Sequence, residues 1–174
     1  MKTETAILKN LLQNEEYTRK VLPFLKADYF TENADKIVYD KVNDFVVKYN
    51  TLPSKEALVI ELQEMKINEE EFKESMELLD EINSDTEEYT DIGWLLDTTE
   101  RFCQDKAIYN AVVESISILD DPKSKANKGV IPDILSGALA VSFDPHVGHD
   151  YLDDSDARFD YYHRVEDRIP FDLE

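Results

Sequence analysis

The residues best suited to metal chemistry lie close together near the C-terminal end of the sequence. Two histidines and three aspartates occur there within nine positions: His146, His149, Asp150, Asp153 and Asp154. Imidazole and carboxylate groups are ligands for divalent cations, and an adjacent histidine–aspartate pair is typical of metal-dependent phosphohydrolases. An all-helical metal phosphohydrolase that uses His146, His149 and Asp150 is therefore one hypothesis for this chain.

The surroundings of this cluster favour a structural role over a metal site. Metal-dependent phosphohydrolases take further histidines from distant helices, and the only other histidine, His163, is nearby in the sequence. The run that begins at Asp154 also lacks the central glycine and the closing glutamate of a calcium loop. Asp144 and Gly148 can shape a turn, and Asp150 can cap a following helix. We therefore expect no metal ion to be bound.

Other catalytic chemistries have no support in the sequence. The chain has four glycines and contains neither GxxxxGKS/T nor GxGxxG, the loops that bind nucleotide phosphates. No serine or cysteine has a histidine within local reach. The single cysteine, Cys103, lies in a helical apolar pattern, which predicts a buried thiol in a reducing, cytosolic setting. We expect no catalytic residue and no bound cofactor in this chain.

The charge of the chain argues against direct contact with nucleic acid. Its 174 residues carry a formal net charge of −20, with an isoelectric point near 4.4. Such a charge repels a phosphate backbone, and no basic groove accompanies Trp94, which we interpret as a core or interface residue. The sequence has no secretory signal and no apolar run of the ~18 residues that a membrane span requires. We expect a soluble, cytoplasmic protein without a membrane partner.

The elements that position these side chains are expected to be helices, because apolar residues recur at spacings of three and four along most of the chain. Abundant Glu, Lys, Leu and Ala, with few glycines and prolines, favour the same fold class, all-α. The first helix begins at Thr3 or Thr5, Asn14 caps a second, residues 31–50 form a third, and Ser54 caps a fourth. Residues 1–120 are thus predicted to form a helical head domain.

Two further helices, at residues 68–82 and about 91–120, are expected to form an antiparallel hairpin that protrudes from the head. At 1.5 Å per residue the second helix is roughly 45 Å long, which is too long for a bundle of this size to cover. We expect its far half to pack against another chain; the alternative is a long helix that spans its own domain. The expected hairpin interface consists of Phe72, Met76, Leu79, Phe102, Tyr109, Val113 and Ile116.

A polar, lysine-rich stretch at residues 121–130 predicts an exposed linker and a domain boundary. The helix that follows, at residues 131–143, starts with Pro132 and is too short to form a core of its own. Its apolar face must therefore dock on another surface, and residues 144–174 form an acidic, aromatic tail. The predicted docking residues are Ile131, Ile134, Leu135, Ala138, Leu139 and Phe143.

Several short motifs, in this order and spacing, give the chain a family resemblance. The most specific are IPDI at 131–134, Ala138–Leu139, SFD at 142–144, VGHD at 147–150, Asp153–Asp154, Ala157–Arg158 and Pro170–Phe171. Weaker matches are Tyr29–Phe30, LPS at 52–54, Ala57–Leu58, Trp94–Leu95, Thr99–Glu100 and Asn110–Ala111. With these motifs the chain resembles, over most of its length, the N-terminal domain and linker helix of DnaB-type replicative DNA helicases, closest to the helicase (primase-helicase) of T-even-like bacteriophages.

This resemblance implies a helical collar on a hexameric ring, in which the docking helix binds the RecA-like motor domain of the neighbouring subunit. In the family the motor unwinds duplex DNA 5′ to 3′ with ATP and Mg²⁺, and the collar helps to recruit primase and the helicase loader. The family's phosphate-binding loop lies beyond Pro170–Phe171, so the motor, which alone contacts DNA, is expected outside this sequence. The resemblance thus implies a non-catalytic oligomerisation and partner-binding module of an ATP-dependent helicase.

Two questions stay open at this point. A free-standing helical adaptor of the replication machinery, without a motor, is an alternative to a helicase domain. In this chain the helix at residues 131–143 has no neighbouring motor domain on which it could dock. We therefore expect it to be disordered, to fold back on the head, or to dock on another copy.

Overall fold

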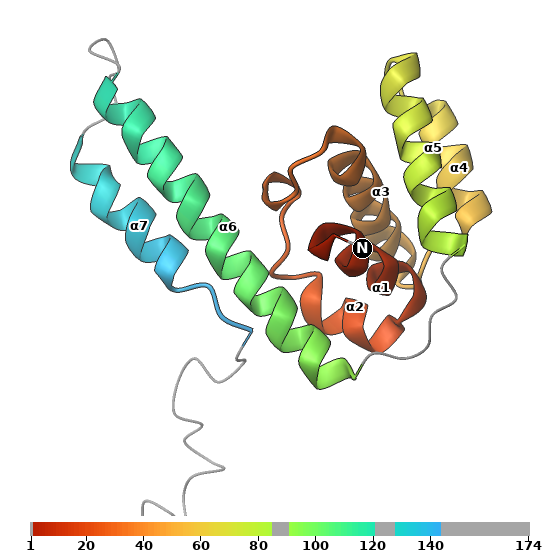
Figure 1. Cartoon of the computed structure of the whole chain (residues 1–174), viewed down its shortest axis with the longest axis horizontal. Helices are drawn as coiled ribbons and strands as arrows, with labels where there is room; N and C mark the ends of the chain where they lie inside the picture. Colours follow the sequence, from red (N-terminus) through yellow and green to blue (C-terminus); the bar gives the residue numbers. More distant parts are fainter. Residues whose placement is uncertain (1, 85–90, 121–127, 144–174) are drawn as a thin grey trace, which may run out of the picture. The chain divides into compact units, whose positions relative to one another are not determined.

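The structure, a computed structural model, describes residues 2–84, 91–120 and 128–143. Over these ranges it contains helices and no strand (Figure 1), which confirms the predicted all-α class. The elements in chain order are α1 (Thr3–Gln13), α2 (Glu15–Val21), η1 (Ala27–Tyr29), α3 (Asn33–Tyr49), α4 (Lys55–Glu64), α5 (Glu69–Ser84), α6 (Ile92–Asp120), η2 (Lys128–Val130) and α7 (Ile131–Leu139).

Short polar side chains cap four of the helix starts: Asn14, Ser54, Asn68 and Asp91 accept hydrogen bonds at the starts of α2, α4, α5 and α6. Asn14 and Ser54 cap α2 and α4 as predicted, and each accepts a hydrogen bond from the backbone N–H three residues further on. α1 begins differently. Its N-cap is Lys2, which makes no side-chain capping bond, so neither Thr3 nor Thr5 caps this helix.

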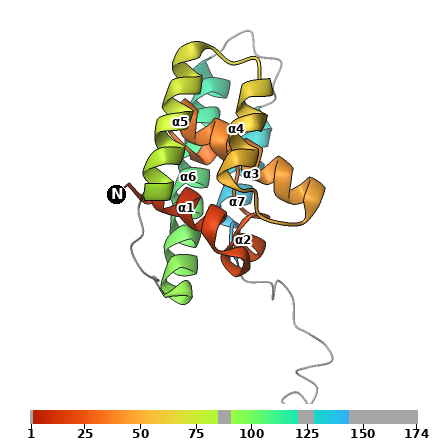
Figure 2. The ribbon, with the colours of Figure 1, turned by 90° about the vertical axis from the view of Figure 1, so that its right-hand side faces the viewer.

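A large part of the hydrophobic core lies between α1, α3, α4 and α5, and buried side chains of α2, η1 and α6 extend it. Apolar side chains at helical spacing meet there, because α5 contacts α1, α3 and α4, and α3 also contacts α1 and α4. Figure 2 shows α4 and α5 side by side. Fully buried side chains of this core include Leu8, Leu11, Val38, Val42, Leu58, Leu62, Leu79 and Ile82.

The long helix α6 connects this core to α7. It contacts α2 and η1, and the buried hydroxyls of Tyr17 and Thr99 share a hydrogen bond of 2.6 Å where α2 meets α6. α7 lies alongside the C-terminal half of α6 and runs in the opposite direction (Figure 1). α6 and α7 therefore form an antiparallel helical hairpin.

The structure corrects the predicted pairing of residues 68–82 with residues 91–120. Both helices are present, as α5 and α6, with ends within two residues of the predicted ones. However, α5 packs on α1, α3 and α4, and the hairpin partner of α6 is α7. Most of the predicted linker, residues 121–127, and the whole tail at 144–174 lie outside the described residues.

Candidate interaction faces of the helical hairpin

The candidate site is built on α6, whose buried side chains recur at every fourth residue. They are Leu95, Thr99, Cys103, Ala107, Ala111 and Ser115, and most of those nearest α7 are small. The hydroxyls of Thr99 and Ser115 donate to the backbone oxygens four residues earlier, at 2.8 and 2.6 Å, so neither is left unsatisfied. Small side chains let two helix backbones approach closely, which explains why the short α7 can pack on this part of α6.

The segment that follows α7 is hydrogen-bonded back to α6. One carboxylate oxygen of Glu100 accepts hydrogen bonds from the Ser142 hydroxyl and the Phe143 backbone N–H, both at 3.0 Å. The side-chain amide of Gln104 donates to the Val141 carbonyl, also at 3.0 Å. We call these contacts the Glu100–Gln104 clasp. The clasp fixes the end of the hairpin that lies nearer the core.

The helix predicted at 131–143 ends at Leu139, so Phe143 lies beyond it, and the predicted docking residues pack partly on α6 of the same chain. Ala138 is buried, whereas Leu139 is 72% exposed. The half-buried members are Ile131, Ile134, Leu135 and Phe143. The Phe143 ring also stacks on Phe24, with ring centroids 4.7 Å apart. Of the three outcomes expected for this helix, the structure shows the fold-back, and docking on a neighbouring motor domain stays a prediction.

The residues of the predicted hairpin interface lie in two places. Four of them pack within the core of the same chain: Phe72, Met76, Leu79 and Phe102. The other three are 66, 48 and 52% exposed on the C-terminal half of α6: Tyr109, Val113 and Ile116. The first group therefore stabilises the head itself, and only the second is open to another molecule.

Three further apolar side chains enlarge this exposed surface, and the sequence reasoning missed them. Ile108, Val112 and Leu119 are 38, 43 and 52% exposed. Their spacing of four and seven residues, which is helical, was the signal that could have found them. We call the six residues the exposed α6 face: Ile108, Tyr109, Val112, Val113, Ile116 and Leu119. At about 100° of rotation per residue they lie largely opposite Ala107 and Ala111, and a continuous apolar surface of this kind marks an interaction site.

Cys103 lies in the buried stripe of α6 and is an unreactive thiol, as predicted. Burial, together with the charge of Glu100, raises the pKa of the Cys103 thiol to about 12, so the thiol stays protonated at neutral pH. Trp94, at the start of α6, is 56% exposed and is therefore not a core residue.

The described part of the chain contains no group of three or more His, Cys, Asp or Glu side chains that could hold a metal ion. The candidate cluster from His146 to Asp154, with His149, Asp150 and Asp153, lies outside that part. None of the helices described here combines the length and the apolar character needed to span a membrane.

Comparison with known proteins supports the resemblance seen in the sequence motifs. The chain is 33% identical, over 175 aligned residues, to a DnaB-like replicative helicase of Enterobacteria phage T4. The match covers 96% of this chain and 36% of the phage protein, so the chain spans about a third of its relative's length. No protein-family profile matches the chain. The predicted resemblance is thus confirmed: over nearly all of its own length, this chain is a relative of a DnaB-like replicative helicase.

Proposed function

We propose that the chain is the N-terminal assembly domain of a replicative DNA helicase and that it joins subunits through the exposed α6 face. That face carries the proposal, because six apolar side chains on one side of a helix are left open to solvent by the described residues. The chain itself is non-catalytic in this proposal. The motor that unwinds DNA 5′ to 3′ with ATP and Mg²⁺ belongs to the part of the full-length protein that this chain does not span.

The physical balance favours apolar contact as the basis of assembly. The formal net charge of −20 makes copies of the chain repel one another, so ion pairs between equivalent acidic surfaces are a poor source of affinity. Burying the half-exposed side chains of the exposed α6 face would contribute on the order of 5 kcal/mol per copy, before ordering costs. Such a contact is adequate when the members of a hexameric ring bind cooperatively.

The other partners in this proposal follow the family resemblance. They are the RecA-like motor domain of the neighbouring subunit, primase and the helicase loader. Leu139, which is 72% exposed on α7, offers the motor domain an apolar contact while α7 stays packed on α6. If all six predicted docking residues were to bind the motor domain, α7 would instead have to separate from α6.

A double substitution tests the proposed role of the exposed α6 face. Val113→Asp with Ile116→Asp places two charges on this face, and both side chains are about half exposed, so the core is not disturbed. We expect the variant to remain helical by circular dichroism. In sedimentation equilibrium its self-association constant should fall about 100-fold or more, because two carboxylates would be buried unpaired in the contact.

A second double substitution, Val47→Asp with Ile60→Asp, is the matched control for this experiment. Val47 on α3 and Ile60 on α4 are 75 and 57% exposed, outside the exposed α6 face, so the same chemical change there should leave self-association unchanged. A wild-type chain that stays monomeric at high concentration would contradict the proposal. A double variant of the exposed α6 face that associates as strongly as the wild type would do the same.

The fold-back of α7 favours a second candidate function, a free-standing helical adaptor of the replication machinery. With α7 packed on α6, most of the predicted docking residues are already buried or half-buried within the same chain. The coding sequence after Glu174 separates the two candidates. A continuing reading frame with GxxxxGKS/T supports the helicase domain, and a stop codon supports the adaptor.

A further inference from the structure

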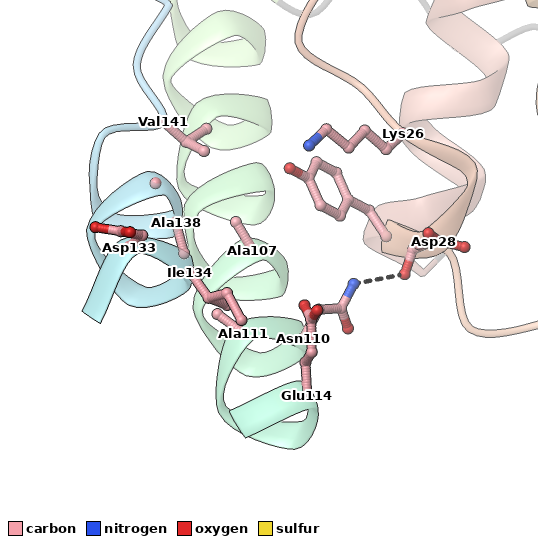
Figure 3. Close-up of a pocket in the computed structure, with 12 residues that line it drawn as sticks. Lys26, Asp28, Ala107, Asn110, Ala111, Glu114, Asp133, Ile134, Ala138 and Val141 are labelled. Carbon is pink, nitrogen blue, oxygen red and sulfur yellow. Dashed lines mark hydrogen bonds between the residues drawn. The ribbon is translucent and has the colours of Figure 1, made fainter. Parts of the chain in front are cut away.

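A groove lies on the other side of α6 from the exposed α6 face. Its volume is about 420 Å³, and its walls come from α6, α7 and the segment around η1 (Figure 3). The apolar lining is made of aliphatic side chains, three of them alanines, beside the ring of Tyr29: Ala107, Ala111, Ala138, Ile134 and Val141. A groove of this size and character can hold one or two side chains of another molecule.

Gly137 keeps the α7 wall of this groove open. A Cβ atom placed on Gly137 would meet no other atom within 4 Å, so internal packing does not require glycine at this position. Glycine in the interior of a helix costs about 1 kcal/mol relative to alanine. The glycine therefore weakens α7 slightly, and the space that it leaves is part of the groove.

Three carboxylates border the groove, and each comes from a different element: Asp28 of η1, Glu114 of α6 and Asp133 of α7. All three side chains are exposed, and none of the ion pairs in the described residues involves them. The Asn110 side-chain amide donates to the Asp28 carbonyl at 3.0 Å, which joins η1 to α6 at one end of the groove. Lys26 also lines the groove, so the rim carries three carboxylates and one ammonium group and is acidic on balance, above an apolar floor.

We infer that this groove binds a basic segment of another protein, which inserts an aliphatic or aromatic side chain between α6, α7 and η1. Lysine or arginine residues beside that anchor pair with Asp28, Glu114 and Asp133. The inference goes beyond the proposed assembly role, because the groove and the exposed α6 face lie on opposite sides of α6. One helix can therefore hold a second copy of the chain on one side and a different partner on the other.

The charges decide between this occupant and two others. Another copy of the chain carries a net charge of −20 and would bring mostly carboxylates to a rim that is already acidic. Nucleic acid would bring phosphates to the same rim. A cationic segment gains from both features, since its charge is attracted by the rim and its anchor is buried on the alanine floor.

The test uses a library of random 12-residue peptides displayed on phage, selected on the whole chain. We expect the selected peptides to share an aliphatic or aromatic residue flanked by lysine or arginine.

A synthetic peptide of the selected sequence is then measured by fluorescence anisotropy against four variants. Gly137→Leu fills the groove, and Ser136→Leu adds the same side chain at the neighbouring, exposed position of α7. Glu114→Gln with Asp133→Asn removes rim charge, and Glu64→Gln with Glu70→Gln removes the same charge from α4 and α5.

The proposal expects the dissociation constant to rise about tenfold or more with Gly137→Leu and with the double rim variant, and to change less than about twofold in both controls. Should Gly137→Leu fail to fold, the rim variant decides alone, because it leaves the packing untouched. The proposal would be overturned if the selection gave acidic peptides or no peptide at all. It would also be overturned if the peptide bound the double rim variant as tightly as its control. A peptide that dissociates self-associated chains would overturn it too, because the groove would then be a contact between copies.

Discussion

At the scale of single residues, Asp35 and Glu4 show how one lysine can help to shift the pKa values of two neighbouring carboxyl groups in opposite directions. Asp35 is only 5% exposed, and burial, followed by the charges of Glu4 and Glu32, raises its pKa to about 6. Burial also raises the pKa of Glu4. Hydrogen bonds from Lys106, at 2.9 Å, and from Thr31 outweigh that effect and leave the pKa of Glu4 below its ordinary value.

This difference gives Asp35 a destabilising role at neutral pH. Because its pKa is higher in the folded chain than in the unfolded chain, ionisation of Asp35 lowers stability as the pH rises from about 4 to above 6. We expect Asp35→Asn to unfold at higher urea concentration than the wild type at pH 7. The gain should be on the order of 1–2 kcal/mol, after allowance for solvent screening, and should vanish near pH 4.

Glu32→Gln is the control for this prediction, because Glu32 is exposed and contributes only a secondary part of the shift. Its stability should differ little from that of the wild type at either pH. Equal stability differences for Asp35→Asn at pH 4 and pH 7 would show that the carboxyl charge is not the cause.

At the scale of elements, the α6–α7 hairpin depends on the Glu100–Gln104 clasp for its alignment. α7 has nine residues, which is too short for a stable helix in isolation, so its helical state depends on packing against α6. The clasp supplies three hydrogen bonds at one end, and two of them go to one carboxylate. Loss of that carboxylate should therefore loosen α7 without unfolding the head.

We expect Glu100→Ala to raise the hydrogen-exchange rates of α7 amides about tenfold, as the loss of charge-assisted bonds worth roughly 1.5 kcal/mol requires. Amides of α1 and α3 should keep their wild-type rates. Glu100→Gln retains an oxygen that can accept both bonds, so its effect should be smaller. Equal acceleration in α1, α3 and α7 would mean that Glu100 supports the whole domain rather than the hairpin.

The same elements show what the sequence could and could not predict. Helical spacing located α5, α6 and α7, and cap residues such as Asn14 and Ser54 located two starts. The spacing did not reveal that Leu79 of α5 packs in the core while Val113 of α6 stays exposed. An apolar stripe indicates that one face of a helix can be buried, but it does not indicate which element buries that face. For that reason the predicted hairpin partner of α6 was wrong, although the positions of the helices were predicted correctly.

The candidate site was partly predictable for a related reason. Tyr109, Val113 and Ile116 were expected to be open to another chain because a helix of this length exceeds its own bundle, and they are exposed. The groove was not predicted at all. It arises where Asp28, Ala107 and Gly137 meet from three elements distant in the sequence, and no local pattern encodes such a meeting.

At the scale of the whole molecule, the net charge of −20 and the exposed α6 face act in opposite directions on self-association. Salt screens repulsion between copies but does not weaken apolar contact. We expect self-association to strengthen when NaCl is raised from about 50 mM to about 500 mM, whereas binding of the basic peptide should weaken. Sedimentation and fluorescence anisotropy at matched salt concentrations measure the two effects. Self-association that weakens with salt would indicate that ion pairs, rather than the exposed α6 face, join the copies.

The continuity of α6 has a mechanical consequence. This helix has 29 residues and is about 43 Å long. The Tyr17–Thr99 hydrogen bond holds it in its first third, the Asn110–Asp28 bond joins it to η1 further along, and the exposed α6 face lies toward its other end. A rigid rod that tilts by about 5° about Thr99 acts as a lever arm, and its end at Asp120, roughly 31 Å away, moves by roughly 3 Å. Substitutions around Thr99 could therefore change the geometry of an assembly whose contacts they never touch.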